Sequence, residues 1–227
     1  MELAPFTFQH EGRLVGFRAQ PGDESALAQV NRFALRPLLA SEVAVFTLDL
    51  CHNQIDRHHS RFPEEELAKI NALVVGRPLM ERHDLRGSLP RGTFFRSALN
   101  QSGERISVRP DVYVLRTRDN EDFILNIEGG VYRETSIGFS FRTPECSICK
   151  KDLRTCDHIP GRTYGEAACH YVMRDVLDVI EGSVVPSGSQ GTGFVAQARS
   201  LPAALKTARE QFHKPVELFS QRLWAEE

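Results

Sequence analysis

Three cysteines and one histidine lie close together in the sequence, in the order Cys146-x2-Cys149-x6-Cys156-x-His158. Thiolates and imidazoles are the ligands of tetrahedral structural zinc, and a Cys-x-x-Cys turn lets both sulfurs reach one ion. A complete set of four protein ligands leaves no open position for a substrate. The spacing therefore predicts a structural zinc ion, with Cys169 and His170 as a nearby pair that could substitute for one ligand.

Two other interpretations of this motif are weaker. A nucleic-acid-binding zinc knuckle would need basic and aromatic surroundings, but 28 Lys and Arg stand against 30 Asp and Glu and no aromatic cluster is present. A metallohydrolase would need an open coordination position, which four protein ligands do not leave. The five cysteines are odd in number and three are crowded, so a reduced compartment and a metal are favoured over a disulfide framework.

A second candidate chemistry is nucleophilic catalysis by a serine. A serine hydroxyl is unreactive near neutral pH unless a histidine accepts its proton and a third group orients that histidine. Among eight histidines, His83 is the candidate base, because it follows a Gly-Arg-Pro turn and a short extended stretch and precedes a polar run. Asp84 is its neighbour but would point away from it on a strand, so it is a poor orienting group.

The strand pattern around Ser136 identifies a candidate nucleophile. Side chains alternate along a strand, so Ile137, Phe139 and Phe141 share one face. Ser136 and Gly138 fall on the other face. Because the apolar face must pack inward, Ser136 is expected to point out of the core, beside a glycine that leaves room for an approaching backbone.

The elements that must position these residues are mainly strands. β-Branched and aromatic residues predict strands at residues 42–50, 92–98, 105–108, 112–115, 131–141, 170–173 and 176–185. Helices are predicted from Pro63 to the Gly76 turn, at residues 121–128, and in the tail between 202 and 224. This pattern predicts a mainly β, α+β fold in which peripheral helices cover a closed or partly open β-barrel.

Composition excludes several classes of protein. The chain has 227 residues, 41% hydrophobic and 26% charged, which is typical of a soluble globular protein. Its net charge of -2 offers no field to hold a phosphate backbone, so no nucleic-acid partner is expected. No apolar run approaches the roughly 20 residues that cross a bilayer, and the first residues lack the basic start of a secretory signal. We expect a cytoplasmic protein without a membrane partner.

Three short motifs follow one another in the chain: Gly-Arg-Pro-Leu-Met-Glu-Arg-His-Asp after a strand and a helix, then Glu-Thr-Ser-Ile-Gly-Phe, then Val-Ile-Glu-Gly-Ser-Val-Val-Pro. This order resembles the prohead maturation proteases of tailed bacteriophages, which are similar in fold to the herpesvirus assemblin proteases. The resemblance covers residues 43–186 and implies an assemblin-like barrel. It also implies a serine protease.

The resemblance assigns roles by position. It makes Ser136 the nucleophile, His83 the general base and Glu181 the acidic third member of a triad. Assemblins use a second histidine in the third place, so His170 is the alternative. Glu181 is favoured because it stands in the matching motif and because a carboxylate stabilises the imidazolium directly.

The chain departs from the family pattern at two places. The cysteine-rich insertion lies between the last two motifs, and the usual Pro-Ala-Asn is replaced by Pro186-Ser187-Gly188-Ser189. Backbone amides of residues 187–193 are candidates for the oxyanion hole. The expected organisation is an N-terminal extension at 1–40, a protease-like barrel domain at 41–195 and a C-terminal helical tail at 196–227. A zinc-knuckle-like insertion occupies residues 144–165 of the barrel domain.

The resemblance implies a serine endopeptidase that cleaves the scaffold and major capsid protein precursors of a phage during procapsid maturation. It would act in the host cytoplasm, within the assembling procapsid. Assemblins act as dimers, so a homodimer is an open alternative. A different class of function is also open: a catalytically inactive structural or scaffolding component of the procapsid that keeps the barrel and the structural zinc site.

Overall fold

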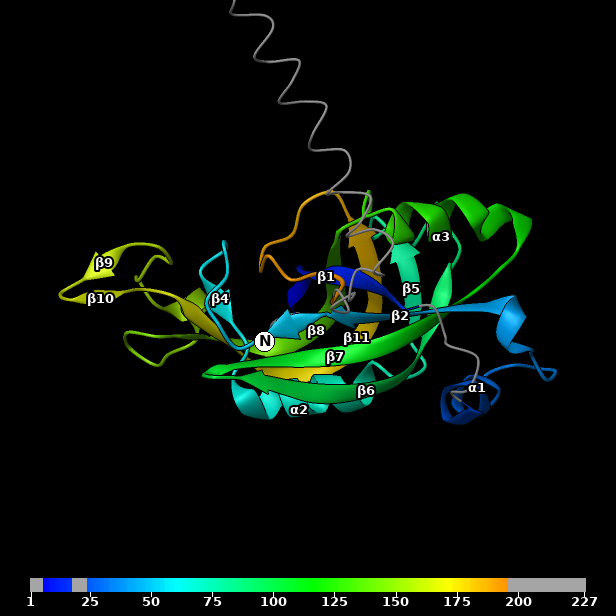
Figure 1. Cartoon of the computed structure of the whole chain (residues 1–227). Helices are drawn as coiled ribbons and strands as arrows, with labels where there is room; N and C mark the ends of the chain where they lie inside the picture. The colour runs from blue at the N-terminus through cyan, green and yellow to red at the C-terminus, as the bar shows by residue number, and fades with distance from the viewer. Residues whose placement is uncertain (1–5, 18–23, 196–227) are drawn as a thin grey trace, which may run out of the picture. The chain divides into compact units, whose positions relative to one another are not determined.

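The computed structural model describes residues 6–17 and 24–195, with side chains described from residue 26 onward. The tail helices predicted within residues 196–227 lie outside the described residues. The described chain is mainly β with few helices, which confirms the expected α+β class (Figure 1). In this part of the chain no helix is long and apolar enough to cross a membrane.

Most strands belong to one sheet, in the order β2-β1-β8-β11-β5-β6-β7-β3 with β4 beside β11. The short strands β9 (Thr163–Tyr164) and β10 (Ala167–Ala168) form a separate two-stranded sheet, at the left of Figure 1. The bounds of the strands are β1 Phe6–Phe17, β2 Val43–Asp49, β3 Cys51–His52, β4 Ser60–Arg61, β5 Pro78–Glu81, β6 Gly92–Ser102, β7 Arg105–Leu115, β8 Glu134–Cys146, β9 Thr163–Tyr164, β10 Ala167–Ala168 and β11 Tyr171–Val185.

The large sheet curls back on itself, because β2 pairs with β1 on one side and with β7 on the other. The short strand β5 (Pro78–Glu81) forms few pairs with its neighbours: two residue pairs with β6 and three with β11. No closed barrel is found among the described residues, so the closed form of the expectation is wrong. The chain leaves β5 after Glu81, where a turn carries Arg82 and His83 away from the ladder.

Three α-helices accompany the sheet: α1 Glu24–Val30, α2 Glu64–Leu73 and α3 Glu121–Glu128. Pro63 is the N-cap of α2, and three glutamates in its first turn complement the positive end of the helix dipole. Leu67 and Ile70 of α2 are fully buried in the main core. Short 3-10 helices occupy Ala40–Glu42, Arg118–Asn120 and Leu153–Thr155.

The alternation predicted for the Ser136 strand is confirmed for its apolar face. Ile137, Phe139 and Phe141 of β8 are fully buried in the main hydrophobic core. The rings of Phe139 and Phe141 lie 5.7 Å apart, and Phe62 contacts Phe139 at 4.9 Å. Each large side chain buried in this way contributes about 1.5–3 kcal/mol, so this face fixes the register of β8.

Several predicted boundaries differ from the structure. β1 pairs with β2 and β8, so residues 6–17 belong to the sheet and not to a separate N-terminal extension. β8 continues through Pro144 to Cys146, so the cysteine-rich insertion begins later than predicted. The segments predicted at 105–108 and 112–115 form one strand, as do those predicted at 170–173 and 176–185.

A bulge explains how β11 stays continuous. Asp175 adopts a positive φ of 57°, and the pairing register with β8 shifts just after it. The buried carboxylate of Glu66 on α2 accepts the backbone N–H groups of Asp175 and Val176, at 3.1 and 2.9 Å. A helix side chain thus satisfies the amide groups that the bulge removes from the ladder.

Candidate active site and candidate metal centre

The antiparallel ladder between β8 and β11 brings the second and third sequence motifs together. Ser136 lies directly opposite Ser183, and Gly138 lies directly opposite Glu181. Directly opposed residues of an antiparallel pair place their Cβ atoms on the same face, about 4.5–5.5 Å apart. Ser136, Ser183 and Glu181 therefore share the face opposite the phenylalanine core.

His83 comes to this face from the end of β5. Sequence reasoning expected an extended conformation here, but Arg82 and His83 both adopt a left-handed φ of 57°. Such a conformation costs roughly 1–2 kcal/mol for each L-residue. Two hydrogen bonds from β11 hold the turn: Arg82 N–H donates to the Val184 carbonyl at 2.9 Å, and His83 N–H donates to Ser183 Oγ at 3.1 Å.

The imidazole of His83 is oriented by Glu181. Nδ1 of His83 lies 2.5 Å from Oε1 of Glu181, and the two side chains are 7% and 1% exposed. A carboxylate in this position holds the proton on Nδ1 and leaves Nε2 free to accept another. The structure thus brings together His83 and Glu181, as the sequence motifs predicted.

His170, the alternative third member, lies elsewhere. It directly precedes β11, at the end where Tyr171 pairs with Cys146, whereas Glu181 pairs with Gly138 near the other end. Eleven residues of strand separate His170 from Glu181, about 35 Å at roughly 3.3 Å per residue. The backbone N–H of His170 donates to Ser147 Oγ at 2.9 Å, so this histidine belongs to the cysteine-rich insertion.

Ser183 is a site residue that the sequence motifs did not identify. It is fully buried, and its Oγ donates a hydrogen bond to Glu181 Oε2 at 2.5 Å. The same oxygen accepts the backbone N–H of His83. One hydroxyl therefore fixes both partners of the His83–Glu181 pair. The spacing Glu-x-Ser, which puts both side chains on one face of a strand, is the signal that could have found it.

Two polar atoms at this site have no partner among the described residues. Oγ of Ser136 and Nε2 of His83 are both buried without a hydrogen bond. Ser136 is off the apolar face of β8, as expected, but it is fully buried and not open to solvent. A buried polar atom without a partner costs about 1–3 kcal/mol, so natural proteins keep few of them.

Gly138 makes room for a side chain, and not for a backbone as the sequence suggested. A Cβ atom at this position would lie 2.2 Å from Oε1 of Glu181, which is far inside van der Waals contact. The bare backbone of Gly138 is therefore the surface on which the Glu181 carboxylate lies. Any larger residue would displace that carboxylate from His83.

We expect Gly138→Ala to lower any activity that depends on the His83–Glu181 pair by about a hundredfold, because a misplacement of about 1 Å at a catalytic group has that effect. The measurement is the cleavage rate of the purified variant. The matched control is Gly138→Ala combined with Glu181→Gln, which should be no slower than Glu181→Gln alone. Additive losses in the double variant would contradict this explanation.

The loop expected to supply oxyanion donors lies next to β8. Gly193 forms a bridge to Glu134, two residues before Ser136. The N–H of Gly188 donates to Oε2 of Glu134, so this amide is already occupied. Arg57 contacts the loop through Ser187 Oγ at 3.2 Å. The loop is thus tied to the start of β8.

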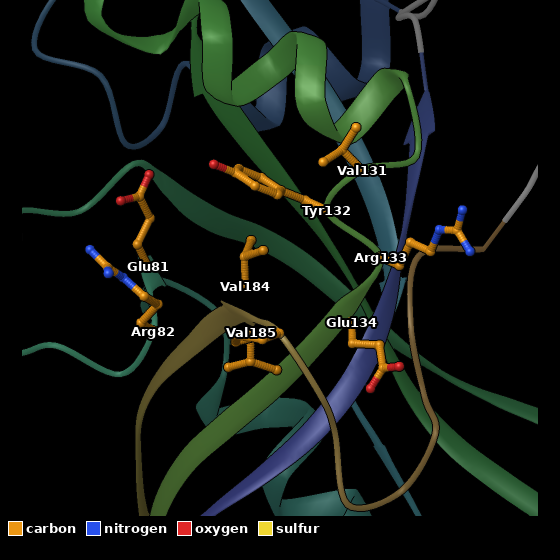
Figure 2. Close-up of a pocket in the computed structure, with 9 residues that line it drawn as sticks. Glu81, Arg82, Val131, Tyr132, Arg133, Glu134, Val184 and Val185 are labelled. Carbon is orange, nitrogen blue, oxygen red and sulfur yellow. The ribbon is translucent and has the colours of Figure 1, made fainter.

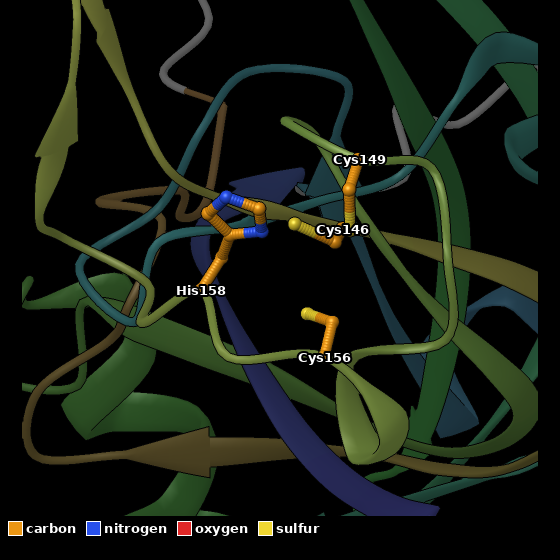
Figure 3. Close-up of side chains that lie close together, drawn as sticks. All are labelled: Cys146, Cys149, Cys156 and His158. Carbon is orange, nitrogen blue, oxygen red and sulfur yellow. The ribbon is translucent and has the colours of Figure 1, made fainter.

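The predicted zinc ligands converge. Ligand atoms of four residues lie within 4.8 Å of one another (Figure 3): Cys146, Cys149, Cys156 and His158. The Cys-x-x-Cys turn closes by two backbone hydrogen bonds, from Lys150 N–H to the Cys146 carbonyl at 3.0 Å and from Cys146 N–H to the Lys151 carbonyl at 2.8 Å. This cluster could hold a metal ion, and its three thiols and imidazole suit zinc.

The surroundings of the cluster distinguish its sulfurs. Burial would raise the pKa of the Cys146 thiol, but hydrogen bonds from the Cys149 and Ile148 N–H groups and from the Cys149 and Cys156 thiols together lower this pKa overall. Cys169, whose Sγ lies 4.0 Å from that of Cys146, has its pKa raised to about 11, mainly by burial. The converging ligand atoms include that of Cys146 but not that of Cys169, so Cys169 lies beside the cluster and not in it.

His158 has the features of a ligand held in place. Its ring packs edge-on against Tyr164 of β9, with ring centroids 4.6 Å apart. Its Nδ1 atom is buried and makes no hydrogen bond to any described residue. A buried imidazole nitrogen without a protein partner is suited to bind a metal ion.

Comparisons of the chain with protein-family models, with curated proteins and with solved structures found no match.

Proposed function

We propose that this chain is a serine endopeptidase with Ser136 as nucleophile, His83 as general base and Glu181 as the group that orients His83. In this mechanism Nε2 of His83 takes the Ser136 proton as Oγ attacks the scissile carbonyl. The imidazolium is stabilised by Glu181 and then gives that proton to the leaving amine. Water hydrolyses the resulting acyl-enzyme by the same proton transfers in reverse.

The main support for the proposal is the buried His83–Glu181 hydrogen bond, together with two buried polar atoms that make no hydrogen bond to a described residue. Ser183 anchors the His83 backbone and lies directly across the ladder from Ser136. This arrangement puts the imidazole on the face that also bears the serine hydroxyl. The two buried atoms without partners, Ser136 Oγ and His83 Nε2, are the pair between which the mechanism moves a proton. Such pairs are often loosely aligned until a substrate is bound.

Burial of Ser136 favours a second candidate function. A peptide cannot reach a fully buried hydroxyl unless neighbouring residues move. A non-catalytic structural or scaffolding component of a procapsid would have no need of such a movement. The two candidates differ in one measurable property, the reactivity of the Ser136 hydroxyl.

The test is labelling with a serine-reactive fluorophosphonate. We expect the full-length protein to be labelled once per chain at Ser136, because only a serine deprotonated by its histidine attacks phosphorus at a useful rate. Peptide mass mapping locates the label. Ser140→Ala, on the same face of β8, is the control and should label normally. A full-length protein that stays unlabelled would support the non-catalytic component.

The substrates and the place of action rest on the sequence resemblance. We propose that the curled sheet is an assemblin-like barrel and that the enzyme cleaves phage scaffold and major capsid protein precursors within the assembling procapsid. Incubation with the major capsid protein of the same phage, followed by sequencing of new termini, tests this part directly. If the capsid and scaffold proteins stay intact while other peptides are cleaved, the protein is a peptidase but the proposed substrates are wrong.

We further propose that the Cys/His cluster holds a structural zinc ion. Loss of the metal would free the segment between β8 and β11, because zinc bound by four ligands supplies much of the folding energy of such small modules. We expect purified protein to contain about one equivalent of zinc, and Cys149→Ser to contain less than about half an equivalent. Metal analysis by mass spectrometry measures both.

Two other cysteines provide the controls for the zinc experiment. Cys169→Ser tests the alternative ligand, and Cys51→Ala tests a buried thiol in the main core, outside the cluster. Both variants should keep their zinc. If Cys169→Ser loses the metal while Cys156→Ser keeps it, the ligand set proposed above is wrong.

A further inference from the structure

A pocket of about 560 Å³ is lined in part by residues that directly neighbour the proposed site residues in the sequence (Figure 2). Its wall includes Arg82, which directly precedes His83, and Val184, which directly follows Ser183. Glu134, two residues before Ser136 on β8, is also part of the wall. Because strand residues are about 3.3 Å apart, the pocket begins within one or two residues of the proposed nucleophile.

The lining of this pocket combines aliphatic side chains, one tyrosine and four charged residues. Val131, Val184, Val185 and Pro186 contribute carbon surface, and Tyr132 forms part of the wall between the α3 turn and β11 (Figure 2). The ring of Tyr132 is held in place by Phe123, at 5.8 Å between centroids. Val131 is 68% exposed, which leaves an apolar side chain available at the pocket for a ligand to cover.

The charged residues around the pocket already have partners or balance one another. Oε1 of Glu81 accepts Nε of Arg91 at 3.1 Å, and Oε2 of Glu134 accepts the Gly188 N–H. Nε of Arg133 donates to the Gly130 carbonyl at 2.7 Å. Two carboxylates and two guanidinium groups leave no net charge in the lining, so the pocket has no strong preference for a charged side chain.

From this lining we infer that the pocket is a specificity subsite for a large aliphatic side chain of a peptide substrate. The side chain belongs to a leucine, isoleucine, valine or methionine within two residues of the bond that Ser136 cleaves. The inference rests on the proposed peptidase function and adds the class of peptide that the enzyme selects. A pocket of this size also has room for the backbone on either side of that side chain.

The test is a cleavage profile of the full-length protein on a library of peptides made by digesting a bacterial lysate. We expect one position within two residues of the cleaved bond to be enriched in aliphatic residues. Val131→Asp should lower kcat/KM on an enriched peptide about tenfold, because a polar wall removes apolar contacts with the substrate. Leu125→Asp is the matched control, because Leu125 is 66% exposed on α3 and does not line the pocket. This variant should cleave the enriched peptide at the normal rate.

The outcomes separate the subsite from the peptidase itself. Cleavage that is lost in Ser136→Ala but shows no aliphatic enrichment overturns the subsite and leaves the peptidase function standing. Enrichment of an acidic residue, which would match Arg82, also overturns it. Equal kcat/KM values for Val131→Asp and Leu125→Asp would also overturn the subsite. A protein that cleaves no peptide and takes no fluorophosphonate overturns both proposals together.

Discussion

Replacing Ser136 by alanine is expected to abolish cleavage of capsid and scaffold precursors, with a loss of at least about a thousandfold. In the proposed mechanism the hydroxyl oxygen of Ser136 forms the acyl-enzyme, and alanine has no nucleophilic atom. The same substitution should leave the free energy of unfolding unchanged or slightly higher, because Ser136 Oγ is buried and donates to no described residue. Gel-based cleavage assays and urea unfolding measure the two effects.

The combination of effects is what makes the Ser136 experiment informative. Truncating a residue that serves only the fold lowers the stability of the protein, whereas truncating a functional residue often lowers activity and leaves stability unchanged. Ser140→Ala, two pairs further along the same face of β8, is the matched control and should cleave at the normal rate. Unchanged cleavage by Ser136→Ala would falsify the peptidase assignment.

Glu181→Gln is expected to lower kcat by about a thousand- to ten-thousandfold, as a neutral amide does in the corresponding position of serine proteases. The carboxylate holds the proton on Nδ1 of His83, and glutamine can donate to that nitrogen instead and favour the wrong tautomer. The shape of the side chain is nearly preserved, so the effect reports on charge and hydrogen bonding. Steady-state kinetics on a capsid-derived peptide provide the measurement.

If His170 and not Glu181 were the third member of the triad, replacing His170 would cause the large loss of activity. The structure leads us to expect a small one. This residue lies at the other end of β11, beside the cysteine-rich insertion, so His170→Gln should change kcat less than about threefold. Zinc content should be measured for this variant, because the backbone of His170 contacts Ser147 within the insertion. A large loss of activity in His170→Gln with zinc retained, and a small one in Glu181→Gln, would reverse the assignment of the third member.

Elements with strong local signals were predicted well. The strand at 42–50, the helix beginning at Pro63 and the helix at 121–128 correspond to β2, α2 and α3. Each depends on neighbours in sequence: β-branched residues, a proline at a helix start, or glycines after a helix. Pro110 shows where such reasoning fails. It separated two predicted strands, but it lies inside β7 where that strand changes partner from β3 to β2.

The N-terminal strand could not be predicted in the same way. Residues 1–40 were expected to form an N-terminal extension, yet residues 6–13 of β1 pair with β8 and residues 14–17 pair with β2. Such a strand is stabilised by the strands with which it pairs, and those strands come from distant parts of the sequence. Residues 6–17 therefore join the sheet through tertiary contacts that no local pattern indicates.

Glu181 became a candidate through the resemblance to the prohead proteases. The amino-acid sequence by itself identified the Cys/His cluster, the apolar face of β8, and His83 and Ser136 as candidates. These depend on short spacings and on a two-residue strand period, which are properties of nearby residues. Only the tertiary structure decided that Ser183 anchors both His83 and Glu181, that Gly138 makes room for the carboxylate, and that a pocket opens beside them. Those features arise from the pairing of β5, β8 and β11, and long-range hydrogen bonds and packing set the register of these strands.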